Sequence, residues 1–255
     1  MNVSGLALTG WGWWLARASS WRALIAWLVA SFVVVLGGAL AGGFLLQVWE
    51  RADGSTAVDG AIAERVVANR TSGLTSFAQA LSRVGSTSVL FPLVVIVAGV
   101  LVWRRRWVFA AFAIVVWGGS VGLYNASKAV VERPRPPVGF RLASAAGSSF
   151  PSGHATQSLA TWCVLAIVVA AVWRPARFVG WVAAGLVVLG VGWSRLYLGM
   201  HWATDVVAGW LIGAAWLVLA SQFVQQAGHL VTEVKRREET PRERPNPGGR
   251  GGSAH

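Results

Sequence analysis

Three short clusters of polar residues interrupt an otherwise apolar sequence, and their residue types suit the chemistry of a charged oxyanion. The first cluster places Lys128 before Arg135 in the pattern K-x6-R-P, and the second is PSGH at 151–154. The third runs from Ser194 to Asp205 in the pattern S-R-x5-H-x3-D. Lysine and arginine hold anions, and histidine serves as a nucleophile or as a general acid and base.

The cations of these clusters predict a binding site for a multiply charged anion. Lys128, Arg135 and Arg195 supply three positive charges, and the planar arginine fork matches two oxygens of a phosphate. Gly153 allows close approach of the backbone, and Ser152 adds a hydroxyl. A helix that begins at the PSGH motif directs its N–H groups and the positive end of its dipole toward the same anion.

The third cluster contains a histidine and a carboxylate at a spacing typical of an oriented nucleophile. His201 and Asp205 are four residues apart, which places them on one face of a helix. A carboxylate there holds one imidazole nitrogen as a donor and leaves the other nitrogen free to attack. The alternative is an interfacial histidine that is only hydrogen-bonded to Asp205.

These residues lie in a chain whose composition is typical of a polytopic membrane protein. Of its 255 residues, 55% are hydrophobic and 13% are charged, the formal net charge is +12, and the mean hydropathy is +0.56. Such hydrophobicity excludes a disordered chain, and the single cysteine, Cys163, excludes a disulfide scaffold. The basic residues stand between long uncharged stretches, so we expect no nucleic-acid partner.

Six uncharged runs are long enough to cross or nearly cross a bilayer, which requires about 20 apolar residues. Backbone groups in lipid must find their hydrogen bonds internally, so runs of this length are helices. The predicted fold is therefore an all-α bundle of six transmembrane spans. The runs cover residues 23–46, 84–103, 107–127, 155–173, 178–193 and 206–228.

Three segments lie outside these spans and divide the chain. Residues 1–22 are rich in tryptophan and predict an interfacial N-terminal segment before the six-span domain at 23–228, whose motifs occupy 128–205. Residues 50–83 mix apolar and charged positions at helical spacing, which predicts one or two amphipathic helices on the membrane face; a solvated loop is the alternative. Residues 229–255 predict a disordered basic tail.

The positive charges also predict which way the bundle faces. The short connections WRRRW at 103–107 and WRPAR at 173–177 are dense in arginine. The positive-inside rule places them in the cytoplasm, together with both termini. Residues 50–83, the 128–154 loop and the 194–205 loop then face the extracytoplasmic side. In this arrangement Arg133 and Arg141 are interpreted as snorkelling outer charges, one of them paired with Glu132.

The three motifs, in this order and on one predicted face, resemble those of the type 2 phosphatidic acid phosphatase family, the lipid phosphate phosphatases. All three patterns match without a substitution, and the resemblance covers roughly residues 84–228. The resemblance implies that His201 attacks phosphorus to form a phosphohistidine, oriented by Asp205. It implies that His154 is the general acid and base. The residues that bind phosphate would be Lys128, Arg135, Ser152, Gly153 and Arg195.

We therefore expect a metal-independent membrane phosphatase without a cofactor. A lipid phosphate or diphosphate fits a site at the membrane boundary, and the candidates are phosphatidic acid, phosphatidylglycerol phosphate and a polyprenyl diphosphate. A lipid phosphotransferase and a non-enzymatic lipid-phosphate binding or transport protein remain as alternatives. The related vanadium haloperoxidases are soluble, so six spans argue against that activity. Sequence alone selects neither the lipid nor an oligomeric state.

Overall fold

The computed structural model describes residues 21–51 and 54–239, and within them every regular element is a helix. Long apolar stretches produce this result because a helix satisfies its own backbone hydrogen bonds. Two short 3-10 helices, Val138–Phe140 and Arg174–Ala176, lie in the connections. The α-helices are α1 Trp21–Arg51, α2 Gly54–Ala68, α3 Ser72–Val84, α4 Thr87–Trp103, α5 Trp107–Val130, α6 Gly153–Val172, α7 Arg177–Tyr197 and α8 Ala203–Glu239.

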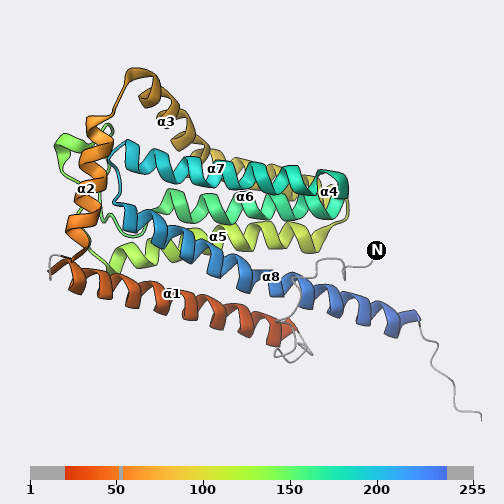
Figure 1. Ribbon diagram of the computed structural model, residues 1–255. Helices are drawn as coiled ribbons and strands as arrows, with labels where there is room; N and C mark the ends of the chain where they lie inside the picture. Colours follow the sequence, from red (N-terminus) through yellow and green to blue (C-terminus); the bar gives the residue numbers. More distant parts are fainter. Residues whose placement is uncertain (1–20, 52–53, 240–255) are drawn as a thin grey trace, which may run out of the picture.

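The long helices run roughly side by side, and α2 lies across one end of them (Figure 1). Helix α6 is at the centre and packs against α5, α7 and α8, while α1 covers α5 and α8. The main core joins side chains of α1, α5, α6 and α8, including Phe112, Val116, Val164 and Trp216. The three sequence motifs are therefore attached to well-packed helices of the bundle.

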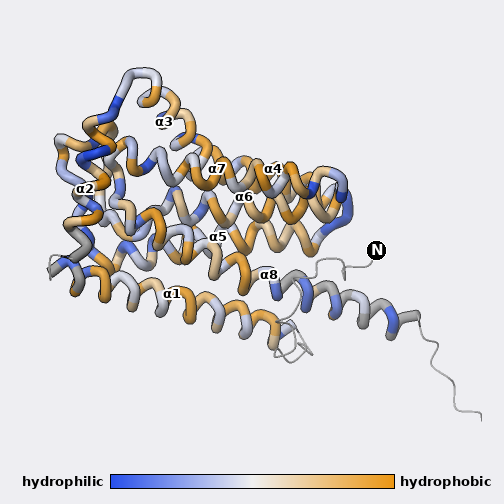
Figure 2. The backbone as a smooth tube through the Cα atoms, in the orientation of Figure 1, coloured by the Kyte–Doolittle hydropathy of each residue, from blue (hydrophilic) through white to orange (hydrophobic). Residues whose placement is uncertain are grey.

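Five of the six predicted spans are single helices that are long and apolar enough to cross a membrane. The remaining predicted run, 84–103, corresponds to α4, which follows α3 after a bend of 42°. In Figure 2 hydrophobic residues follow the long helices, and hydrophilic residues gather at the ends of the bundle. The prediction of an all-α transmembrane bundle is confirmed. Its second span, α4, follows α3 after a bend between the two helices.

Most of the segment at 50–83 forms two helices, α2 and α3, as the pattern predicts, while residues 50–51 end α1. The Thr71 hydroxyl caps α3 by accepting a hydrogen bond from the Leu74 N–H at 3.3 Å. Helix α2 has a second role that the pattern does not predict, because its Asp59 is buried against the bundle. This segment therefore contributes to the interior of one end of the protein as well as to its surface.

The boundaries of the outer segments differ from the prediction where the structure describes them. Helix α8 continues to Glu239, so residues 229–239 are helical and the predicted disordered tail does not begin at 229. Apolar positions in the membrane part of α8 nucleate a helix, and good helix formers such as Glu, Lys and Arg extend it. The remainder of the predicted tail, 240–255, and most of the predicted interfacial segment, 1–20, lie outside the described residues.

Candidate active site

The three sequence motifs meet at the end of the bundle that α2 covers. The connection from α5 to α6 carries Arg135, and it returns to the 198–202 turn between α7 and α8. A backbone hydrogen bond joins these loops, because the Leu142 N–H donates to the Leu198 carbonyl at 2.9 Å. A second one joins the connection to the first turn of α8, where the Ser152 N–H donates to the Asp205 carbonyl at 3.0 Å. Motifs that are far apart in sequence therefore form one site.

His201 lies in the turn before α8 and is 5% exposed. Its Nδ1 is 2.8 Å from the Ser149 carbonyl oxygen and 3.6 Å from Oδ2 of Asp205. A carbonyl oxygen only accepts, so Nδ1 carries the proton and Nε2 keeps its lone pair. This differs from the expected arrangement on one helix face, because α8 begins at Ala203 and the nearest acceptor is a loop carbonyl.

Asp205 lies in the first turn of α8 and is completely buried. Its Oδ2 accepts hydrogen bonds from the Trp202 N–H at 2.9 Å and from the Ser149 hydroxyl. Its Oδ1 accepts from Arg133 at 2.5 Å. The carboxylate is thus fixed by several donors, with one oxygen toward the imidazole. Ser149, which the sequence did not single out, contacts both His201 and Asp205.

The free nitrogen of His201 faces a guanidinium. Nη1 of Arg135 lies 3.4 Å from Nε2 and donates to the Met200 carbonyl at 2.8 Å. Burial lowers the pKa of Arg135, and it lowers the pKa of His201 from 6.5 to about 4, although Asp205 acts to raise the latter. The imidazole is therefore neutral near pH 7, which is the form that a nucleophile requires.

The other two predicted cations lie at the same end. Nζ of Lys128 donates to the Ser148 carbonyl at 2.6 Å, near the end of α5. Nη1 of Arg195, near the end of α7, donates to the Ser82 hydroxyl at 2.6 Å. Nε of Arg195 is buried and has no hydrogen-bond partner in the part of the chain that the structure describes. A buried charged donor without a partner is costly, so it favours an anionic ligand here.

The second motif opens α6. The Ser152 hydroxyl accepts a hydrogen bond from the Ala155 N–H at 3.5 Å and caps the helix. A Cβ at Gly153 would lie 3.0 Å from the Tyr124 ring, so glycine here permits close helix packing as well as backbone access. His154 follows at the start of α6, within electrostatic range of Arg195 and His201. The structure thus brings all eight predicted site residues to one end.

The comparisons with known proteins agree with this arrangement. The model of the PAP2 superfamily matches residues 106–229, which include every motif. Phosphatidylglycerophosphatase B of Bacillus subtilis is 31% identical over 172 residues, covering 65% of this chain and 82% of that protein. The chain belongs to the PAP2 superfamily. An undecaprenyl-diphosphatase of Sulfolobus acidocaldarius is 28% identical over 153 residues, covering 58% of this chain and 69% of that one.

A solved structure extends the likeness of this PAP2 protein to the whole bundle. The crystal structure of a transmembrane PAP2 type phosphatidylglycerolphosphate phosphatase from Bacillus subtilis superposes with a TM-score of 0.64. The match covers 87% of this chain and 98% of that chain, at 25% sequence identity. The family resemblance that the three motifs indicate is therefore confirmed, and so is the all-α membrane fold.

The prediction that Arg133 is a snorkelling outer charge is wrong. Arg133 is 2% exposed, whereas a snorkelling charge would reach water. It pairs with Glu50, Asp59 and Asp205, and the neighbouring Glu132 is exposed instead. The sequence carries little signal for this, because two of the three partners precede Arg133 by 74 and 83 residues.

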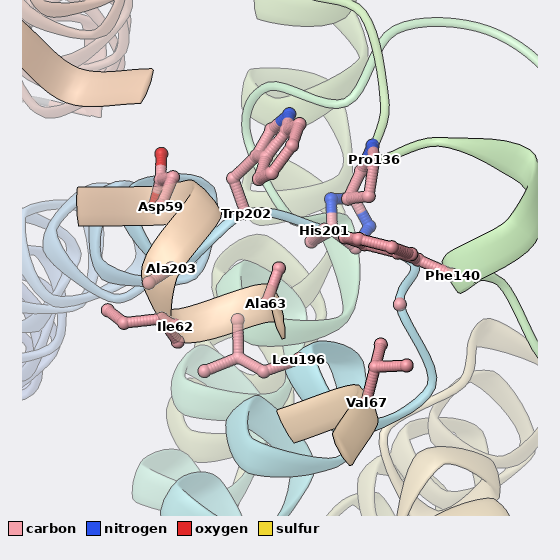
Figure 3. A pocket seen from close by; sticks show the side chains of 11 residues that line it. Asp59, Ile62, Ala63, Val67, Pro136, Phe140, Leu196, His201, Trp202 and Ala203 are labelled. Atoms are coloured by element: carbon pink, nitrogen blue, oxygen red, sulfur yellow. The ribbon is translucent and has the colours of Figure 1, made fainter. Parts of the chain in front are cut away.

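A small, partly open pocket lies between α2 and His201 of this PAP2 protein. Ile62, Ala63 and Val67 of α2 line it together with Leu196, and His201 and Trp202 also border it (Figure 3). The lining is mostly apolar on the α2 side. A group attached to the phosphate of a bound substrate would therefore meet hydrocarbon side chains here.

Proposed function

We propose that this PAP2 protein is a membrane phosphatase that hydrolyses a lipid phosphate or diphosphate through a phosphohistidine. The observation that carries the proposal is the state of His201: its Nδ1 donates to the Ser149 carbonyl, and its Nε2 faces Arg135 at 3.4 Å. A neutral, oriented imidazole beside a cation is suited to attack a phosphate. The relatives named as lipid phosphatases support the same activity.

The reaction proceeds in two displacements. The lone pair of Nε2 of His201 attacks phosphorus, and the bond from phosphorus to the leaving oxygen breaks as that oxygen takes a proton from His154. His154 then removes a proton from water, which attacks phosphorus and breaks the P–N bond. Asp205 stabilises the positive charge on the imidazole ring while Nε2 is bonded to phosphorus.

The cations stabilise the transition state of both displacements. Lys128, Arg135 and Arg195 neutralise charge on the phosphoryl oxygens, and the N–H groups at the start of α6, after Ser152 and Gly153, add hydrogen bonds. No divalent cation is needed in this scheme. The carboxylates nearest the site, Glu50, Asp59 and Asp205, already bind Arg133.

The site faces the extracytoplasmic side in this proposal, and both termini are cytoplasmic. The arginine-rich connections, from α4 to α5 and from α6 to α7, lie at the end of the bundle away from α2 (Figure 1). The positive-inside rule assigns that end to the cytoplasm. In a Cys163→Ala background, Ser144→Cys should react with an impermeant thiol reagent on intact cells. Arg104→Cys should react only after permeabilisation; the reverse pattern would invert the orientation.

Phosphate release by the purified protein in detergent tests the activity. The panel contains phosphatidic acid, phosphatidylglycerol phosphate and a polyprenyl diphosphate, each with and without EDTA. We expect release from at least one of them that EDTA does not reduce. His201→Ala and His154→Ala should each lose at least about 100-fold in kcat.

The matched control is His229→Ala, because His229 is an exposed histidine on α8. This variant should retain wild-type turnover. Wild-type activity in His201→Ala would refute the phosphohistidine mechanism. Loss of all activity in EDTA, with recovery on adding a divalent cation, would refute the metal-independent scheme.

A further inference from the structure

One guanidinium joins three helices at the end of the bundle that holds the site. Arg133 donates to Oε1 of Glu50 from α1 at 2.7 Å and to Oδ2 of Asp59 from α2 at 2.8 Å. Its Nη1 donates to Oδ1 of Asp205 at 2.5 Å and to the Thr204 hydroxyl at 2.7 Å, both from α8. We call these five residues the Arg133 cluster.

The cluster contacts the nucleophile through one residue. Arg133 binds Oδ1 of Asp205, and the other oxygen, Oδ2, lies 3.6 Å from Nδ1 of His201. A carboxylate is planar, so a donor that fixes one oxygen also fixes the direction of the other. Arg133 therefore determines how Asp205 faces the imidazole without touching the imidazole itself.

The same cluster attaches α2 to the start of α8. Oδ1 of Asp59 accepts a hydrogen bond from the Thr204 N–H at 3.1 Å, and Oδ2 accepts from the Thr204 hydroxyl at 2.5 Å. Helix α2 also supplies Ile62 and Val67 to the pocket beside His201. The position of that pocket wall thus depends on the contact that Asp59 makes with Arg133 and Thr204.

A neutral residue of similar size cannot take over the electrostatic role of Arg133 in the cluster. The side chains of Asp59 and Asp205 are 1% and 0% exposed, and Glu50 is 19% exposed. Buried carboxylates that lack a cation repel one another and cannot be solvated. Burial acts to lower the pKa of Arg133, but the charge of Asp205 and the hydrogen bonds to the carboxylates raise it, so the guanidinium remains charged.

We propose that Arg133 is a positioning residue of the reaction, because it holds Asp205 toward His201. Through its hydrogen bond to Asp59, it also makes the rate of catalysis depend on how α2 packs against the start of α8. This inference rests on the proposed phosphatase function. Arg133 does not bind the phosphate in this scheme. Its donors already serve Glu50, Asp59, Thr204 and Asp205.

The test compares kcat and KM for the best lipid phosphate of the panel in Arg133→Met, Arg133→Lys, Asp59→Asn and Glu132→Gln. Glu132 is the matched control, because it is an exposed neighbour of Arg133 in the same loop. Size-exclusion chromatography and thermal unfolding identify the folded fraction, and orthovanadate inhibition reports the phosphate site independently.

We expect Arg133→Met to lower kcat about 10-fold to 100-fold per folded molecule. KM and orthovanadate inhibition should change less than about 3-fold, because the groups that bind phosphate remain. Arg133→Lys should recover part of kcat, since an ammonium keeps the charge but cannot bind three carboxylates at once. Asp59→Asn should lower kcat to a smaller extent, and Glu132→Gln should match the wild type.

Two results would overturn the proposal. Wild-type kcat in folded Arg133→Met would exclude a positioning role, and a raised KM with unchanged kcat would make Arg133 a substrate ligand instead. If Arg133→Met does not fold, unchanged kcat in both Arg133→Lys and Asp59→Asn refutes the proposal. Wild type and His201→Ala in the same assay separate this outcome from failure of the proposed function, which would leave the wild type inactive or His201→Ala active.

Discussion

The burial of His201 predicts that this residue makes the folded protein less stable in mild acid. His201 is enclosed by the Ser149 carbonyl, Asp205 and Arg135. Burial lowers its pKa from 6.5 to about 4; Arg195 and Lys128 act in the same direction, and Asp205 opposes them. The perturbation is a change from pH 7 to pH 5, applied to the wild type and to His201→Gln.

The sign follows from proton binding. Below pH 6.5 the unfolded chain protonates this histidine, while the folded protein keeps it neutral until about pH 4. The unfolded state therefore binds more protons, and stability falls as the pH is lowered through this window. Between pH 7 and pH 5 the loss is about 2 kcal/mol, which corresponds to roughly 4–8 °C in Tm for a chain of this size.

Thermal unfolding in detergent, followed by tryptophan fluorescence, measures this effect. Other groups also titrate between pH 5 and pH 7, so the quantity of interest is the difference between the two proteins. The Tm of the wild type should fall by roughly 4–8 °C more than the Tm of His201→Gln, in which this titration is absent. Parallel pH dependences would show that folding does not lower the pKa of His201, and the argument that burial keeps this imidazole neutral would fail.

Two further substitutions test how the site is held. Gly199→Ala should lower stability by about 1–3 kcal/mol in thermal unfolding. The residue has φ +67 and a Cβ would lie 2.0 Å from a backbone oxygen; Gly139→Ala, in open space, should be neutral. Ser82→Ala removes the hydroxyl that binds Arg195 and should lower kcat/KM about 10-fold. Ser76→Ala, exposed on the same helix, should not, and equal rates in the two serine variants would exclude that role of Ser82.

Much of the fold could be predicted from the sequence, because a long apolar segment in a bilayer must satisfy its backbone hydrogen bonds internally and so forms a helix. Five predicted spans correspond to single helices, and the sixth corresponds to α4. The break between α3 and α4 falls where the predicted amphipathic segment meets the predicted run, and Gly85 and Ser86 cap the two helices there. The angle of 42° has no such signal in the sequence. The high charge of residues 229–239 predicts disorder, but Glu, Lys and Arg are also good helix formers and α8 extends to Glu239.

The sequence predicts which residues gather at the site better than it predicts the contacts between them. The spacing of His201 and Asp205 indicates a contact on one helix face, but α8 begins only at Ala203. The imidazole therefore turns toward the Ser149 carbonyl. A backbone acceptor has no side-chain signature, so no sequence pattern could identify it. The burial of Arg133 is unpredictable for a related reason, because spacing along a loop does not indicate which arginine points inward.

The structure separates the cations at this end of the bundle into two kinds. In the proposed mechanism this separation leaves some of the positive charge available to the phosphate. Arg133 binds three carboxylates, Glu50, Asp59 and Asp205. The hydrogen bonds of Lys128 and Arg135 instead include backbone carbonyls. Dipoles orient a cation but leave its charge, so these two remain available to an anion. By binding the carboxylates, Arg133 prevents them from cancelling the field that would attract the phosphate in the proposed mechanism. Burial is the main reason that His201 stays neutral, and the charges of Arg195 and Lys128 act in the same direction.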